Sequence, residues 1–173
     1  MKKWFGMICS AVAGICGFIF MSISCWNLKV TRYIAGVSGT EKDHANGWDI
    51  IKDVKDTNGC VLYKIFAIIL LAVSVLLIIS AIVLLLKNLN VLKVTMNIEL
   101  INNILLSVFV LCAIVMLIAL GIMSKDASRS TVQEIAGLKV GAKASYSAGI
   151  GSWLNLIVGA IACSLSWVFA ERK

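Results

Sequence analysis

The chain has 173 residues, of which 60% are hydrophobic and only 14% are charged, and its mean hydropathy is +0.96. A soluble domain carries about 25% charged residues, so this composition excludes an ordinary water-soluble globular protein. The net charge of +7 is spread over the polar segments and forms no single basic block, which disfavours a nucleic-acid partner.

Four long apolar runs account for this composition, and the charge-free core of each is long enough to cross a bilayer. Backbone polar groups in lipid must be hydrogen-bonded internally, so each run is predicted to be a helix. We therefore expect an all-α integral membrane protein, a four-helix transmembrane bundle that forms a single domain over residues 1–173. The predicted spans are residues 4–26, 62–86, 100–123 and 146–170.

The first run has one alternative interpretation, because Met-Lys-Lys before an apolar stretch is also how a cleaved signal peptide begins. The run is longer than the h-region of about 7–15 residues that is typical of signal peptides, and no Ala-x-Ala site follows it. We expect an uncleaved first helix.

Residues 27–60 form the larger of two predicted extramembrane loops. Its segment Leu-Lys-Val-Thr-Arg-Tyr-Ile is rich in strand-forming residues and predicts a short strand. The stretch that follows, which ends at Asn46-Gly47, is typical of turns, and the apolar spacing after it predicts a short helix. Tyr33, Trp48 and Ile51 are the residues of this loop that we expect to contact a partner.

Residues 125–145 form the smaller loop, in which Thr131 and Glu134 have the spacing of a capping box and predict one or two helical turns. Four spans place both loops on one side of the membrane and both termini on the other. The basic residues next to the first span favour termini in the cytoplasm and a location in the plasma membrane.

Small residues recur four positions apart at the end of the chain. Residues four apart share one face of a helix, and small side chains let transmembrane helices approach closely. We expect a packing seam that pairs the last helix with Gly14 and Gly17 of the first, with Asn155 hydrogen-bonded inside the bundle. A contact with another copy or another subunit is the alternative use of the same seam. Its residues on the last helix are Ser147, Gly151, Asn155, Gly159 and Cys163.

The six cysteines contain no Cys-x-x-Cys pair, which disfavours a thiol oxidoreductase. Cys25 and Cys60 stand at the two ends of the larger loop, so a disulfide there is one prediction and two thiols the other. His44, the only histidine, has no Cys or carboxylate at metal-ligand spacing and is interpreted as a solvated loop residue. We expect no catalytic residue, no metal and no cofactor.

The layout is similar to that of claudin-like four-span proteins, which have short cytoplasmic ends, a large first outer loop and a smaller second one. Claudins carry a Trp…Gly-Leu-Trp…Cys…Cys signature in the first loop, and this chain has Trp26, Gly47-Trp48 and Cys60 to set against it. The resemblance is one of topology only.

The expected function is that of a non-enzymatic multi-pass membrane protein that acts through protein contacts, as a subunit, an assembly partner or an immunity-type protein. Its partners would be the lipid bilayer and another membrane protein or further copies of itself. The alternative is a homo-oligomeric pore or carrier for ions or small solutes. Asn102, Asn103 and Ser107 could begin the polar stripe that a pore needs, although the run continues almost wholly apolar after them.

Overall fold

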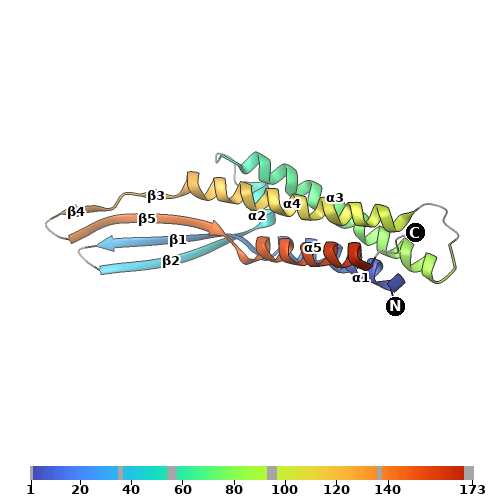
Figure 1. Ribbon diagram of the computed structural model, residues 1–173. Coiled ribbons are helices and arrows are strands. Elements are labelled where there is room, and N and C mark those ends of the chain that lie inside the picture. The colour runs from blue at the N-terminus through green and yellow to red at the C-terminus, as the bar shows by residue number, and fades with distance from the viewer. Residues whose placement is uncertain (1, 35–36, 54–57, 93–96, 136–137, 170–173) are drawn as a thin grey trace.

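The computed structural model describes residues 2–34, 37–53, 58–92, 97–135 and 138–169. Four long helices form a bundle, and a sheet extends from one end of it (Figure 1). The long helices are α1 (Lys2–Met21), α3 (Cys60–Asn88), α4 (Ile98–Ala127) and α5 (Ile150–Phe169), and α2 (Gly47–Asp53) is short. The strands are β1 (Ser24–Ile34), β2 (Val37–Asn46), β3 (Arg129–Ser130), β4 (Gln133–Ile135) and β5 (Leu138–Ala148).

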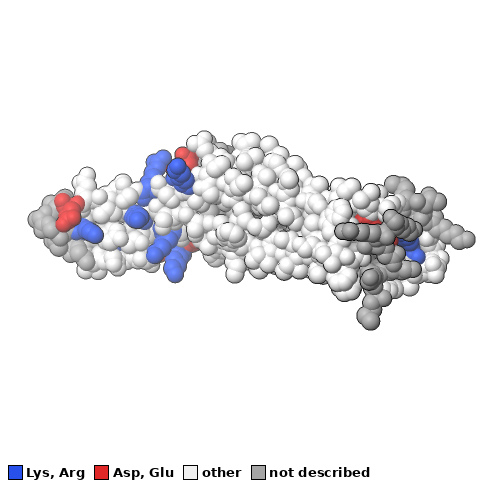
Figure 2. Space-filling model, viewed as in Figure 1, with Lys and Arg blue, Asp and Glu red and all other residues white. Residues whose placement is uncertain are grey.

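The four long helices are each long and apolar enough to cross a membrane, which confirms the four predicted spans and describes a multi-pass membrane protein. Large apolar side chains stay exposed on their outer faces, as Ile8, Val12, Ile15 and Ile19 do along one side of α1. Figure 2 shows no charged atom over the middle of the bundle on this face, while charges lie at both ends. An uncharged apolar belt of this kind suits a lipid environment.

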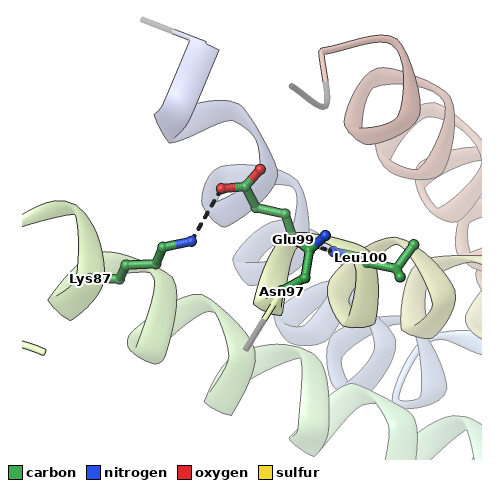
Figure 3. Close-up of polar contacts among 4 residues, drawn as sticks. All are labelled: Lys87, Asn97, Glu99 and Leu100. Atoms are coloured by element: carbon green, nitrogen blue, oxygen red, sulfur yellow. Dashed lines mark hydrogen bonds and ion pairs between the residues drawn. The ribbon is translucent and has the colours of Figure 1, made fainter. Parts of the chain in front are cut away.

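The helices enclose one core, in which α1 and α4 each pack against both α3 and α5. Helices α3 and α4 lie side by side and are joined by a short link. One ion pair joins the two helices at this link, and an N-cap begins α4 (Figure 3). Lys87 Nζ lies 3.4 Å from Glu99 Oε1, and Asn97 caps α4 by accepting a hydrogen bond from the Leu100 N–H at 3.3 Å.

The prediction of an all-α fold is wrong, because the two loops join in a five-stranded antiparallel sheet. The order is β2-β1-β5-β3, and β4 also pairs with β5. The central pair joins segments far apart in the chain, since Leu28 of β1 lies opposite Tyr146 of β5. Which segments pair over such a separation is decided by the tertiary structure, because each strand satisfies its backbone groups on the other.

Several predicted helix limits are wrong, because strands of the sheet take up the ends of two predicted spans. The first span was expected to reach residue 26, but α1 ends at Met21 and residues 24–26 belong to β1. The last was expected to begin at residue 146, which lies in β5, and its predicted end at residue 170 lies outside the described residues. Cys25 and Trp26 are buried where the sheet meets the bundle, and a buried strand is as apolar as a buried helix.

The loop predictions have mixed outcomes. The strand at 28–34 is confirmed, and so is the short helix, which is α2. Asn46 caps α2, because its Oδ1 accepts a hydrogen bond from the Asp49 N–H at 2.9 Å. The expected turn region is wrong over most of its length, since it forms β2. The expected helical turns around Thr131 and Glu134 are wrong as well, since Gln133–Ile135 is a strand paired with β5.

The sheet has two chemically different faces, because side chains alternate along a strand and directly opposed residues share a face. The apolar face carries Trp26, Leu28, Val30 and Ile34 of β1, with Val37 of β2 and Val140, Ala142, Ala144 and Tyr146 of β5. Three charged residues share this face, namely Asp43 and the ion-paired Arg32 and Glu41. The polar face carries Asn27, Lys29, Thr31 and Tyr33 of β1, with Lys42 and His44 of β2 and Lys143, Ser145 and Ser147 of β5.

Candidate functional site

The small-residue seam is used for contacts within the chain. Ser147 lies on β5, whereas the other four predicted members lie on α5. A Cβ at Gly151 would stand 2.5 Å from the Phe20 carbonyl oxygen at the end of α1, and one at Gly159 would stand 2.8 Å from the Phe109 ring of α4. Only glycine lets α5 come this close to both neighbours.

The glycines of α1 face other helices than we expected. A Cβ at Gly14 would stand 2.8 Å from the Ser74 carbonyl oxygen of α3, and one at Gly17 would meet the Ser74 side chain and the Phe109 ring. Alongside its contact with α5, α1 packs extensively on α3. A sequence with four spans carries no signal for which helix a given small face meets.

Asn155 is buried in the bundle, as expected, at 3% exposure. Its Oδ1 has no hydrogen-bond partner among the described residues, so the expected bond is not found for that atom. Cys163, the last member of the seam, has its Sγ 3.5 Å from Ser107 Oγ of α4.

A network of buried polar side chains joins α1, α3 and α4 near the termini, inside the apolar bundle. Ser80 Oγ donates a hydrogen bond to Asn102 Oδ1 at 2.8 Å, and the Ser10 hydroxyl contacts the same oxygen. Asn102 Nδ2 in turn donates to the Gly6 carbonyl oxygen at 3.3 Å. The three side chains are at most 7% exposed, so these bonds are made away from water and lipid.

A second part of the network joins α4 to α5. The Ser166 hydroxyl donates to Asn103 Oδ1, and Trp167 Nε1 donates to Ser107 Oγ at 3.2 Å. The sequence pointed to Asn102, Asn103 and Ser107 as the start of a polar stripe but gave Ser80 and Ser166 no role. Each of these serines is visible in the sequence as a hydroxyl within an apolar run. Its hydrogen-bonding role is seen only when the neighbouring helix is in place.

The three residues expected to form a partner-contact loop are not brought together. Tyr33 lies at the far end of β1, where it pairs with Ser38 and Gly141. Trp48 and Ile51 lie on α2 and pack against the core of the bundle, and Trp48 Nε1 donates a hydrogen bond to Ser22 Oγ at 3.1 Å. Nine strand residues, about 30 Å along the sheet, separate Tyr33 from the helix α2 that carries Trp48 and Ile51.

The two loop cysteines both lie buried at the junction of sheet and bundle. Burial raises the pKa of the Cys25 thiol, and contacts with Ser152, Tyr63 and the Gly47 backbone oppose that effect. The Cys25 Sγ lies 3.4 Å from the Phe20 carbonyl oxygen. The disulfide between Cys25 and Cys60 stays a prediction.

An open groove of about 710 Å³ lies on the polar face of the sheet, beside the bundle. Lys29, Lys42 and His44 line it, together with Asn27 and Ser147. His44 keeps the exposed position expected for a solvated residue. Among the described residues, no three His, Cys, Asp or Glu side chains gather as metal ligands would.

The apolar face ends in a row of exposed aliphatic side chains far from the bundle. Val37 pairs directly with Ile34, and Val140 immediately precedes Gly141, the β5 residue that pairs with Tyr33, so the row crosses three neighbouring strands. Val37 is 73% exposed, Ile34 71% and Val140 41%. We call these three residues the distal apolar row.

Comparison of the chain with protein-family models, with curated protein sequences and with solved structures gives no match.

Proposed function

We propose that this membrane protein acts through protein–protein contacts, as a subunit, an assembly partner or an immunity-type protein, and that the distal apolar row is its contact surface. The observation that supports the proposal most is the exposure of Ile34 and Val37 at the end of a sheet that extends beyond the apolar bundle (Figure 1). Contiguous exposed apolar patches on water-facing surfaces mark interaction sites.

Covering the distal apolar row is energetically favourable. Burying an exposed Val or Ile side chain contributes roughly 1.5–3 kcal/mol, so a partner that covers the row gains several kcal/mol. The β2 strand adds a second means of contact, since no strand is paired to its outer edge among the described residues. Such an edge offers backbone groups to an incoming strand.

The pore alternative has weaker support. Asn102 and Asn103 were the residues that could begin a polar stripe, and each is buried and bonded to serines of the same chain. Their amides therefore stabilise one bundle, and a conducting path would have to form between copies.

The test is gentle-detergent purification from the native membrane, followed by mass determination of the intact assembly. We expect a defined complex from the wild-type protein and at least about tenfold less partner with the Ile34→Thr/Val37→Thr variant, because threonine keeps strand propensity but removes apolar contact area. The matched control is Thr31→Ser/Thr40→Ser, which alters the polar face and should retain the partner.

Three outcomes are informative. A hetero-complex that the apolar-face variant loses would support the subunit proposal and identify the neighbours. A closed ring of identical copies that conducts ions in liposomes would favour the pore instead. A monodisperse monomer, or a complex unaffected by the variant, would contradict the distal apolar row as the contact surface.

A further inference from the structure

The groove on the polar face carries a concentration of positive charge. Lys29 of β1 and Lys42 of β2 are directly opposed in the sheet. Like charges in this arrangement destabilise a strand pair, so the free protein has an unfavourable contact that a bound anion would relieve. Lys143 of β5 stands diagonal to Lys29 on the same face, because it pairs with Thr31. Figure 2 shows basic side chains gathered where the sheet meets the bundle.

The rest of the lining suits an oxyanion. Asn27, Asn46 and Ser147 add amide and hydroxyl groups, which can donate hydrogen bonds to phosphate oxygens, and the Ser24 hydroxyl donates to Asn27 Oδ1. The one acid in the lining is Asp43, whose carboxylate accepts a hydrogen bond from the His44 backbone N–H at 2.8 Å. By strand alternation the Asp43 side chain belongs to the apolar face.

The groove begins where the apolar helices α1 and α5 meet the sheet. Its lining includes Ser22, the first residue after α1, and Ser147, three residues before α5. The headgroup layer of a bilayer is about 5–8 Å thick on each side, so it lies at this level. Ile19 on α1 and Ile150 on α5 are 51% and 61% exposed, which leaves apolar surface for acyl chains next to the groove.

We propose that this groove binds the headgroup of an anionic phospholipid, with Lys29 and Lys42 as the charged contacts. Lysine side chains are long and flexible, so both ammonium groups can turn back toward the headgroup layer. The proposal concerns the polar face and does not depend on the protein partner proposed for the apolar face. A result that contradicts one of these two proposals therefore does not contradict the other.

The experiment uses the full-length protein in detergent and measures binding of dioctanoyl phosphatidylglycerol by native mass spectrometry and by thermal shift. Dioctanoyl phosphatidylcholine is the zwitterionic comparison, and glycerol phosphate is the soluble-anion comparison. Each lysine near an anionic headgroup contributes about a fivefold gain in affinity, so Lys29→Gln/Lys42→Gln should bind phosphatidylglycerol about thirtyfold more weakly. The matched control Arg32→Gln/Lys139→Gln removes the same charge outside the groove and should bind as the wild type does.

The variant removes a like-charge pair, so we expect it to fold, and monodisperse elution with unchanged circular dichroism would verify this. Equal affinity for the two lipids, or unchanged affinity in Lys29→Gln/Lys42→Gln, would overturn the proposal. Glycerol phosphate binding as tightly as the lipid would assign the groove to a soluble anion, and displacement of the lipid by a poly-glutamate peptide would assign it to an acidic protein. Both of these results would overturn the lipid assignment.

Discussion

Polar side chains within the apolar bundle have a clear role at the scale of single residues. Asn102 stands at the centre of a network that draws on three helices, through Ser10 and Gly6 of α1 and Ser80 of α3. In lipid, helices gain nothing from hiding apolar surface, so close packing and hydrogen bonds between helices determine how they associate. The amide is well suited to this role, because it accepts and donates at once.

Asn102→Ala should destabilise the bundle by about 1–3 kcal/mol, because two interhelical contacts of its oxygen and one of its nitrogen are lost. The measurement is the unfolding midpoint in detergent. Ile104→Ala, two residues further along α4 at an exposed position, is the matched control and should shift the midpoint much less. Equal shifts for the two variants would contradict a structural role for the amide network.

At the scale of elements, glycines decide which helices can touch. Gly159 of α5 lies against Phe109, whereas a Cβ at Gly121 of α4 would meet nothing within 4 Å. The two positions therefore separate a glycine that packing requires from one that it does not. The same comparison explains why the small-residue seam is a feature of tertiary packing in this chain.

Gly159→Leu should sharply reduce the yield of folded, monodisperse protein, because leucine has to displace the Phe109 ring from the centre of the bundle. Gly121→Leu adds the same side chain to a transmembrane helix and should behave like the wild type. Size-exclusion chromatography in detergent, with the folded fraction compared between variants, is the measurement. A well-behaved Gly159→Leu protein would show that the close approach of α5 and α4 is not needed.

At the scale of the whole molecule, the sheet lies at one end and both termini lie at the other (Figure 1). This arrangement agrees with four spans and places the two strand-forming loops on the same side, where they can pair. The charges follow the same division, since they gather at the two ends of an uncharged belt (Figure 2).

Tags at the two termini should be accessible from the same side of the native membrane, and a tag between β1 and β2 from the opposite side. Our prediction of cytoplasmic termini adds that the tag between the strands faces outward. Labelling with a membrane-impermeant reagent before and after permeabilisation is the measurement. Termini labelled on opposite sides would contradict four spans, whereas a cytoplasmic sheet would reverse only the orientation.

The sequence by itself determined the number of spans, their approximate positions, the shared side of the termini and the short helix α2. These properties follow from local composition, because about 20 consecutive apolar residues need lipid and a helix wherever the rest of the chain lies. The strand over residues 28–34 could also be predicted from local composition, since Val30 and Tyr33 prefer extended backbone.

Only the tertiary structure decided the sheet, the partners of each glycine and the place of the candidate sites. The stretch ending at Asn46 contains turn-forming residues, yet it becomes β2 because β1 offers it a ladder of hydrogen bonds. Lys29 and Lys42 become neighbours through that pairing, and Val140 joins Ile34 through the pairing of β1 with β5. Contacts between segments distant in the chain depend on how the whole molecule satisfies its backbone, and no local pattern encodes them.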